Sequence, residues 1–75
     1  MKSLAAQRAL RKRIREALRG KQADRLAMRI ERPSVDWDGS FHEIDEILRL
    51  AQPGDEIWIA LFINDNIEDT VEVAV

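Results

Sequence analysis

Few side chains in this 75-residue sequence are of a type that performs chemistry, and none has the spacing of a catalytic motif. His42 is the only histidine, with Asp45 three residues later. A serine triad would need Ser3, Ser34 or Ser40 against that one imidazole, and no Gly-x-Ser-x-Gly elbow is present. The chain also has no Gly-rich phosphate loop and no cysteine. We therefore predict a non-enzymatic protein without cofactors, in which His42 lies on the outer face of a helix.

One acidic stretch has a faint likeness to a calcium-binding loop. The segment 36–40 (Asp-Trp-Asp-Gly-Ser) places oxygen-bearing side chains at alternate positions. Gly39 is at the wrong place for such a loop, and the twelfth position is Ile47 rather than glutamate. We expect no metal site here.

Charge is distributed very unevenly along the chain. Residues 1–33 contain eleven of the twelve Lys and Arg residues but only three of the fourteen Asp and Glu residues, although the formal net charge is only −2. An asymmetry of this size between two halves indicates a charged partner or self-association.

The acidic half is the first candidate binding surface, because a dense array of carboxylates can occupy a site built for phosphates. A solvated acidic surface is the alternative, and Trp37 is either an anchor at the edge of the core or an exposed contact for a partner. The candidate residues are Asp36, Trp37, Asp38, Glu43, Asp45, Glu46, Asp65, Glu68 and Asp69.

The basic N-terminal segment is the second candidate surface. Its cations can bind nucleic-acid phosphates, lie on an anionic membrane, or pair with the acids of the same chain. No aromatic residue lies among them for base stacking. The residues are Arg8, Arg11, Lys12, Arg15 and Arg19.

A helix is expected to carry these cations from Ser3 to Arg19. Apolar residues such as Leu10 and Ile14 recur on one side at helical spacing, and Gly20 follows where a left-handed cap belongs. An arginine-rich, acid-poor N-terminus also resembles a mitochondrial presequence, but we predict an ordered helix.

Two further elements follow. Apolar residues alternate from Leu26 to Ile30, which indicates a strand ended by Pro33; a helix over 21–32 is the alternative. After a loop at 33–39, Ser40 and Glu43 have the spacing of a capping box that opens a helix from Phe41 to Ala51.

The C-terminal residues 55–75 predict a β-hairpin. The run Ile57 to Ile63 is apolar on both faces, so both faces need cover. Residues 64–66 tolerate left-handed backbone, and we place Asp65 and Asn66 at the centre of the turn. From Thr70 onward apolar and polar residues alternate, as in an outer strand.

These elements predict a single α+β domain over 1–75, in the order α-β-α-β-β. A right-handed crossover through the second helix would place the strand at 26–30 parallel to Ile57–Ile63, in a three-stranded mixed sheet packed by two helices. No apolar run is long enough to span a bilayer, and the absence of cysteine suits the cytoplasm.

In size, lack of catalytic motifs and acidic decoration, the chain resembles the small phage-encoded inhibitors of bacterial defence, including the anti-CRISPR proteins. That resemblance implies a module whose acidic half blocks a basic, nucleic-acid-binding surface on a partner complex. The strongly basic N-terminal segment departs from such mimics. Two alternatives remain: a nucleic-acid-binding protein that uses the basic helix, and a structural or antitoxin-like subunit of unknown oligomeric state.

Overall fold

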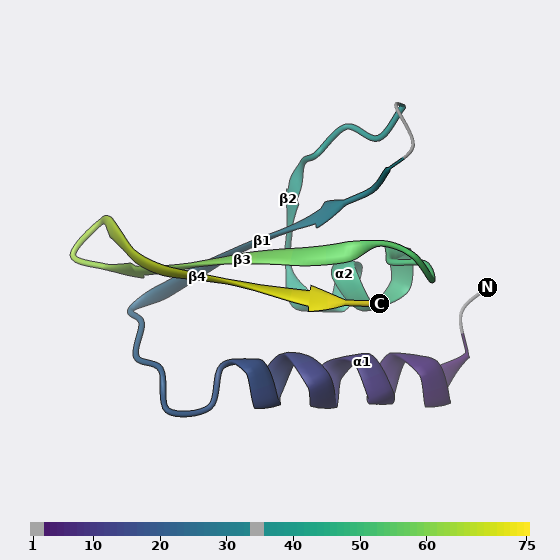
Figure 1. The fold of residues 1–75 in the computed structure, drawn as a ribbon, viewed down its shortest axis with the longest axis horizontal. Helices are drawn as coiled ribbons and strands as arrows, with labels where there is room; N and C mark the ends of the chain where they lie inside the picture. The colour runs from purple at the N-terminus through teal and green to yellow at the C-terminus, as the bar shows by residue number, and fades with distance from the viewer. Residues whose placement is uncertain (1–2, 34–35) are drawn as a thin grey trace.

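The computed structural model describes residues 3–33 and 36–75 of the chain, so that two residues of the predicted loop at 33–39 lie outside the description. The fold is α+β, as predicted, but the predicted three-stranded mixed sheet and the order α-β-α-β-β are wrong: the sheet has four antiparallel strands, and the order is α-β-β-α-β-β. Figure 1 shows both helices on one side of the sheet. The elements are α1 (Leu4–Ala17), β1 (Arg25–Glu31), β2 (Phe41–His42), α2 (Ile44–Leu50), β3 (Glu56–Ile63) and β4 (Asn66–Ala74).

The predicted first helix is confirmed as α1. Ser3 is its N-cap, and the hydroxyl oxygen accepts a hydrogen bond from the Ala6 N–H at 3.1 Å. Leu10 and Ile14 are buried beneath the sheet, as the apolar spacing predicted. Gly20 has a φ of +78° and lies just beyond the helix, where a residue without Cβ adopts left-handed backbone without strain.

The predicted strand at 26–30 is confirmed as β1, but its direction is not. It runs antiparallel to β3, with Met28 opposite Ile59, and the predicted parallel pairing is wrong. The reason is a short strand, β2, that pairs antiparallel with β1 before the chain enters α2. The crossover through α2 therefore joins β2 to β3, which flank β1 on its two sides in the order β2-β1-β3-β4.

The start of the second helix is also corrected. Phe41 and His42 form β2, and α2 covers only Ile44–Leu50. The capping box is not formed: Glu43 is the N-cap without a side-chain hydrogen bond, and the Ser40 N–H donates to Asp38 Oδ1 at 3.0 Å. Phe41 fits the helical stripe in spacing, but pairing with the edge of β1 satisfies its backbone instead.

The C-terminal hairpin is confirmed, with its turn one residue earlier than predicted. Ile63 pairs with Asn66, so Asn64 and Asp65 form the loop, with φ values of 51° and 65°. Positive φ at both loop residues is the pattern of the type I′ turn that matches the twist of the strands.

The core lies between the sheet and the two helices, and the opposite face of the sheet has no helix over it among the described residues. We expected both faces of Ile57–Ile63 to need cover. Ile57, Ile59 and Leu61 face the helices and are almost fully buried. Trp58 and Phe62 alternate with them, face the other side and are half-buried. We call this side the open face.

Candidate functional site

The structure gives His42 a different setting from the one predicted. The side chain lies in β2 rather than on the outer face of a helix, and it is only 17% exposed. Its Nδ1 is 3.6 Å from a carboxylate oxygen of Glu46, and its ring centroid is 6.5 Å from that of Trp37. Among the candidate nucleophiles, the Ser3 hydroxyl caps α1, and Ser34 lies outside the described residues.

The calcium-like segment forms hydrogen bonds with its own backbone. Asp38 accepts the N–H of Ser40, and this bond is the main reason why the pKa of Asp38 is lowered. Gly39 has a φ of +67° inside this turn. Within the part of the chain that the structure describes, no group of three or more His, Cys, Asp or Glu residues is placed to hold a metal ion.

Trp37 packs inward at the edge of the core. The guanidinium of Arg32 lies 3.9 Å from the centre of the Trp37 ring, and the indole contacts the buried apolar cluster. Of the two readings of this residue, the geometry favours the anchor. Sequence reasoning did not find Arg32 as its partner.

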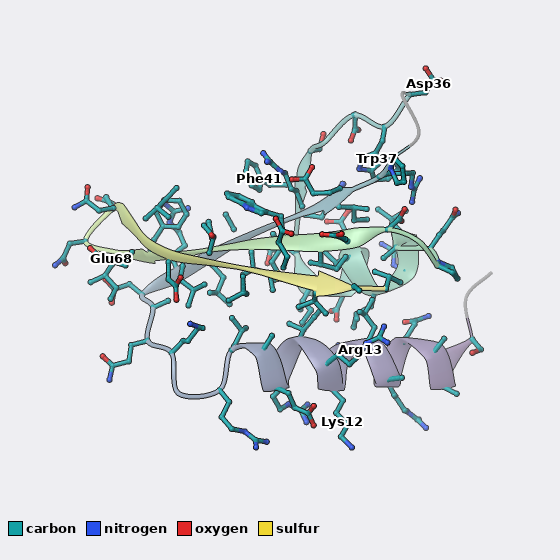
Figure 2. All side chains as sticks on the ribbon, viewed as in Figure 1. Lys12, Arg13, Asp36, Trp37, Phe41 and Glu68 are labelled. Atoms are coloured by element: carbon teal, nitrogen blue, oxygen red, sulfur yellow. The ribbon has the colours of Figure 1, made fainter. Side chains whose placement is uncertain are left out.

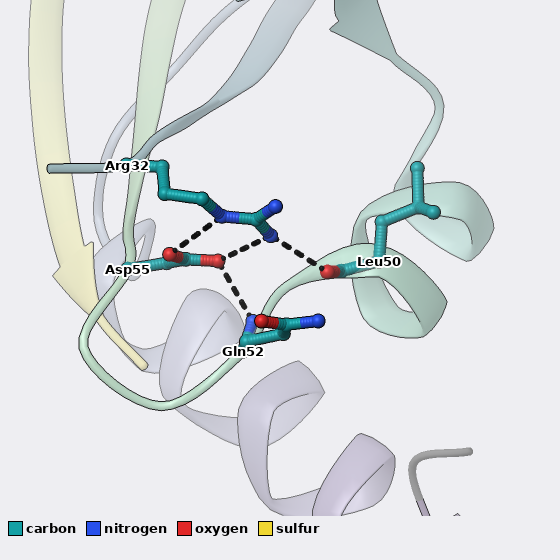
Figure 3. Close-up of polar contacts among 4 residues, drawn as sticks. All are labelled: Arg32, Leu50, Gln52 and Asp55. Carbon is teal, nitrogen blue, oxygen red and sulfur yellow. Dashed lines mark hydrogen bonds and ion pairs between the residues drawn. The ribbon is translucent and has the colours of Figure 1, made fainter. Parts of the chain in front are cut away.

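Arg32 and Asp55 form a partly buried clasp between the residue after β1 and the loop before β3 (Figure 3). Arg32 donates two hydrogen bonds to the Asp55 carboxylate, at 3.0 and 2.8 Å, and a third to the carbonyl oxygen of Leu50 at 3.1 Å. The same carboxylate accepts the Gln52 N–H at 2.8 Å. The pKa of Arg32 is raised, first by its hydrogen bond to Asp55. Asp55 is only 4% exposed. The pair therefore ties the end of β1 to the loop before β3, and its role is structural.

Two of the predicted acidic residues each pair with one cation of the basic half of the chain. Asp45 accepts a hydrogen bond from Arg11 at 2.9 Å, and Asp69 accepts one from Lys21 at 2.6 Å. The pKa of Asp69 is lowered, chiefly by the Lys21 hydrogen bond. The two charged halves of the sequence therefore touch at these points.

The other acidic candidates do not gather on one surface. Figure 2 shows Asp36 and Glu68 at opposite ends of the molecule, and Asp65 occupies the hairpin turn. Glu43 begins α2, where the helix dipole favours a carboxylate. Glu46 lies beside His42.

The basic candidates on α1 do share a surface. On a helix, residues spaced by four and three positions lie on one side, and Lys12 points away from the sheet (Figure 2). Arg11 is the exception, because it reaches Asp45. Four exposed cations form the outer ridge, and no ion pair holds any of them within residues 3–33 and 36–75; they are Arg8, Lys12, Arg15 and Arg19.

Aromatic and arginine side chains gather on the open face, a feature that sequence reasoning missed. The Arg25 guanidinium lies 4.0 Å from the centre of the Phe62 ring, and that of Arg29 lies 4.4 Å from the centre of the Trp58 ring. Phe41 is 57% exposed, and its ring centroid is 6.3 Å from that of Trp58. The alternation in β1 and β3 is visible in the sequence, but the register that brings the residues together is not.

The other end of the open face is acidic. Glu31 pairs with Glu56 across β1 and β3, and Glu72 on β4 shares a hydrogen bond with Glu56. That hydrogen bond, followed by repulsion from Glu56 and Glu31, raises the pKa of Glu72. We call these three residues the glutamate cluster. None of them was among the predicted site residues.

An open groove of about 660 Å³ lies along one edge of the sheet. It follows the first half of β1, beside β2 and the start of α2. Its lining is Arg25, Leu26, Ala27, Met28, Phe41, His42, Glu43, Glu46 and Phe62.

Comparison with known proteins finds no family model, no curated protein and no solved structure that matches this chain. Neither helix in the described ranges has the length and apolarity needed to cross a membrane.

Proposed function

We propose that this protein is a small non-catalytic module that binds the backbone of nucleic acid through the outer ridge of α1. The observation that carries the proposal is that the ridge cations are exposed and share one side of a helix with Lys12, which points away from the sheet (Figure 2). The inner side of the same helix is held in the core by Leu10 and Ile14, so the ridge is presented on a rigid element.

The spacing of the ridge suits a line of phosphates. From Arg8 to Lys12 and on to Arg15, successive cations are about 4.5–6 Å apart along the helix axis, because each residue rises about 1.5 Å. Each phosphate that a cation neutralises releases condensed counterions, which drives binding and makes it sensitive to salt. The ridge has no aromatic residue for stacking, so we expect contact with the backbone without sequence readout.

The test compares two variants whose net charge changes by the same amount. Lys12→Gln with Arg15→Gln removes two ridge cations, whereas Arg49→Glu reverses one exposed cation on α2. Binding to a fluorescein-labelled DNA duplex of about 20 base pairs is measured by anisotropy between about 50 and 200 mM salt. We expect the ridge variant to bind more weakly and to lose about two units from the slope of log K against log salt, with Arg49→Glu close to wild type.

Equal weakening by both variants would show that net charge, not the ridge, controls binding. Absence of wild-type binding at the lowest salt would overturn the proposal outright.

The glutamate cluster supports a second candidate, the inhibitor function implied by the resemblance to anti-CRISPR proteins. Glu56 and Glu72 lie together on the open face, whereas Glu31 forms an ion pair with Arg29 at 3.1 Å, and a basic partner surface would relieve the repulsion between Glu56 and Glu72. In this case the chain itself binds no nucleic acid. It is instead recovered with a basic, nucleic-acid-handling complex after nuclease treatment, and Glu56→Gln with Glu72→Gln abolishes that recovery.

A further inference from the structure

One edge of β1 is left without a neighbouring strand. β2 pairs with Met28 and Arg29 only, and within the described part of the chain no strand lies beside 25–27 on that side. Glu43 is still extended, but α2 begins at Ile44, so β2 cannot extend further along β1. The open groove of about 660 Å³ occupies the place where a longer β2 would lie.

We propose that this groove binds an extended segment of a partner protein, which adds a strand to β1 at 25–27. Unpaired backbone N–H and C=O groups at a sheet edge are a template for an incoming strand, and main-chain hydrogen bonds supply much of the affinity in this mode of recognition. The segment would continue the sheet beyond the end of β2.

The lining of the groove defines the side chains that such a segment carries. Phe41 and Phe62 are on the open-face side, and Leu26, which is 38% exposed, is on the helix side. Since successive side chains of a strand point to opposite faces, apolar residues of the segment can contact both sides.

Charge complementarity sets the direction of the segment. Arg25 lies at one end of the groove, at the start of β1, whereas Glu43 lies at the other end, directly after β2. Glu46, one turn into α2, adds to the acidic end. The occupant is therefore an apolar, extended segment with an acidic residue beside Arg25 and a basic residue beside Glu43.

The edge of the sheet formed by β4 differs from the edge formed by β1. β4 carries Glu68, Asp69 and Glu72, and its pairing with β3 is irregular at Leu61 and Phe62. Acidic side chains and bulges are features by which edge strands resist pairing. The edge of β1 at 25–27 has regular pairing with β3, and the guanidinium of Arg25, its one charged residue, lies over the Phe62 ring, so this edge remains open to a strand.

The experiment uses the full chain and a phage-displayed library of random segments of about ten residues. We expect selected peptides to alternate apolar residues between an acidic and a basic end. A synthetic copy of the strongest peptide should shift the amide NMR signals of 25–27 and of His42 and Glu43. Leu26→Lys, which places a charge on the edge, should weaken binding at least about tenfold.

Ile67→Lys is the matched control, because Ile67 is an exposed apolar residue on β4 outside the groove. It should bind the peptide like wild type, and thermal melts verify that both variants fold. A second variant, Arg25→Glu, should bind a peptide whose acidic end is replaced by lysine better than the original peptide.

Several results would overturn the proposal: no alternating pattern among the selected peptides, equal weakening by the two lysine variants, or NMR shifts outside the groove. Concentration-dependent dimerisation with shifts at 25–27 in the absence of peptide would assign the groove to a second copy of the chain instead. None of these readouts depends on α1, so the result is independent of nucleic-acid binding.

Discussion

At the scale of single residues, Arg32 and Asp55 form a contact on which we expect the stability of this small domain to depend. Every bond that Figure 3 draws to the Asp55 carboxylate comes from Arg32 or from the backbone of Gln52. A buried charge with its partner removed is far more costly than a buried pair, because neither water nor another ion replaces the lost contact. A domain of this size has only a few kcal/mol of net stability.

We predict that Asp55→Asn lowers the free energy of unfolding by about 2 kcal/mol, because it weakens two charge-assisted hydrogen bonds from Arg32 and leaves the partly buried guanidinium without a counter-charge. Urea denaturation followed by circular dichroism measures the change. Asp45→Asn is the control, because Asp45 forms an exposed ion pair with Arg11 and its removal should leave stability nearly unchanged. Equal effects of the two variants would contradict the role of the clasp.

Glu72 makes stability depend on pH in the opposite sense to a salt-bridged acid. Its pKa is raised above the ordinary value of 4.5 by the hydrogen bond to Glu56 and by repulsion from Glu56 and Glu31. The folded state therefore holds this proton more tightly than the unfolded state does. The resulting stabilisation is full below pH 4.5 and is lost as pH rises through the raised pKa.

We predict that Glu72→Gln melts at a higher temperature than wild type near neutral pH, because it removes one of three neighbouring negative charges. The advantage should shrink as pH falls towards 4.5, where wild-type Glu72 becomes protonated. Thermal melts across that range measure it, with Glu68→Gln as the control outside the glutamate cluster. A difference in melting temperature between Glu72→Gln and wild type that does not change with pH would contradict the raised pKa of Glu72.

At the scale of elements, the β3–β4 hairpin has one residue, Asp65, in a backbone conformation that glycine would adopt more easily. Asp65 has a φ of 65° in a type I′ turn, and the preferred pair at these two positions is Asn-Gly. Asn64 already matches the preferred pair. The turn position follows from Ile63 pairing with Asn66, one residue earlier than the sequence alone predicted.

We predict that Asp65→Gly stabilises the protein by about 0.5 kcal/mol, because glycine adopts positive φ without a steric penalty. Asp65→Ala, which removes the same charge but keeps a Cβ, should destabilise it. Thermal unfolding of both variants distinguishes backbone conformation from charge. Stabilisation by alanine as well would show that the charge of Asp65, rather than its backbone, is unfavourable.

The helix α1 has two separate roles because its two sides differ. Leu10 and Ile14 fix it under the sheet, while the outer ridge remains exposed. The groove beside β1 depends on a different pair of elements, β2 and α2. Nucleic-acid binding and strand addition can therefore be tested independently in the same molecule.

At the scale of the whole molecule, the asymmetry of charge along the chain becomes a separation of charge between faces. The outer ridge lies on the helix side, and the glutamate cluster lies on the open face. Among the residues that the structure describes, only Arg11 with Asp45 and Lys21 with Asp69 join the basic and acidic halves through exposed pairs. Most of the field of α1 is therefore available to a partner, because the acids that could cancel it lie elsewhere.

The amino-acid sequence by itself determined the features that depend on neighbours along the chain. The amphipathic α1, a helix within 41–51 and the C-terminal hairpin follow from periodicity and turn residues, whereas the alternation at 26–30 favoured the strand β1 over a helix without excluding it. The cations of the outer ridge were predictable for the same reason, since a helix places residues of fixed spacing on one side.

Only the tertiary structure decided the features that depend on strand pairing. The two-residue β2, with Phe41 opposite Arg29, is too short to leave a periodic signal, yet it reverses the direction of β1 relative to β3. Register then placed arginines over aromatic rings and three glutamates side by side. These contacts join residues distant in sequence, and their pairing energy is set by cross-strand neighbours rather than by local propensity.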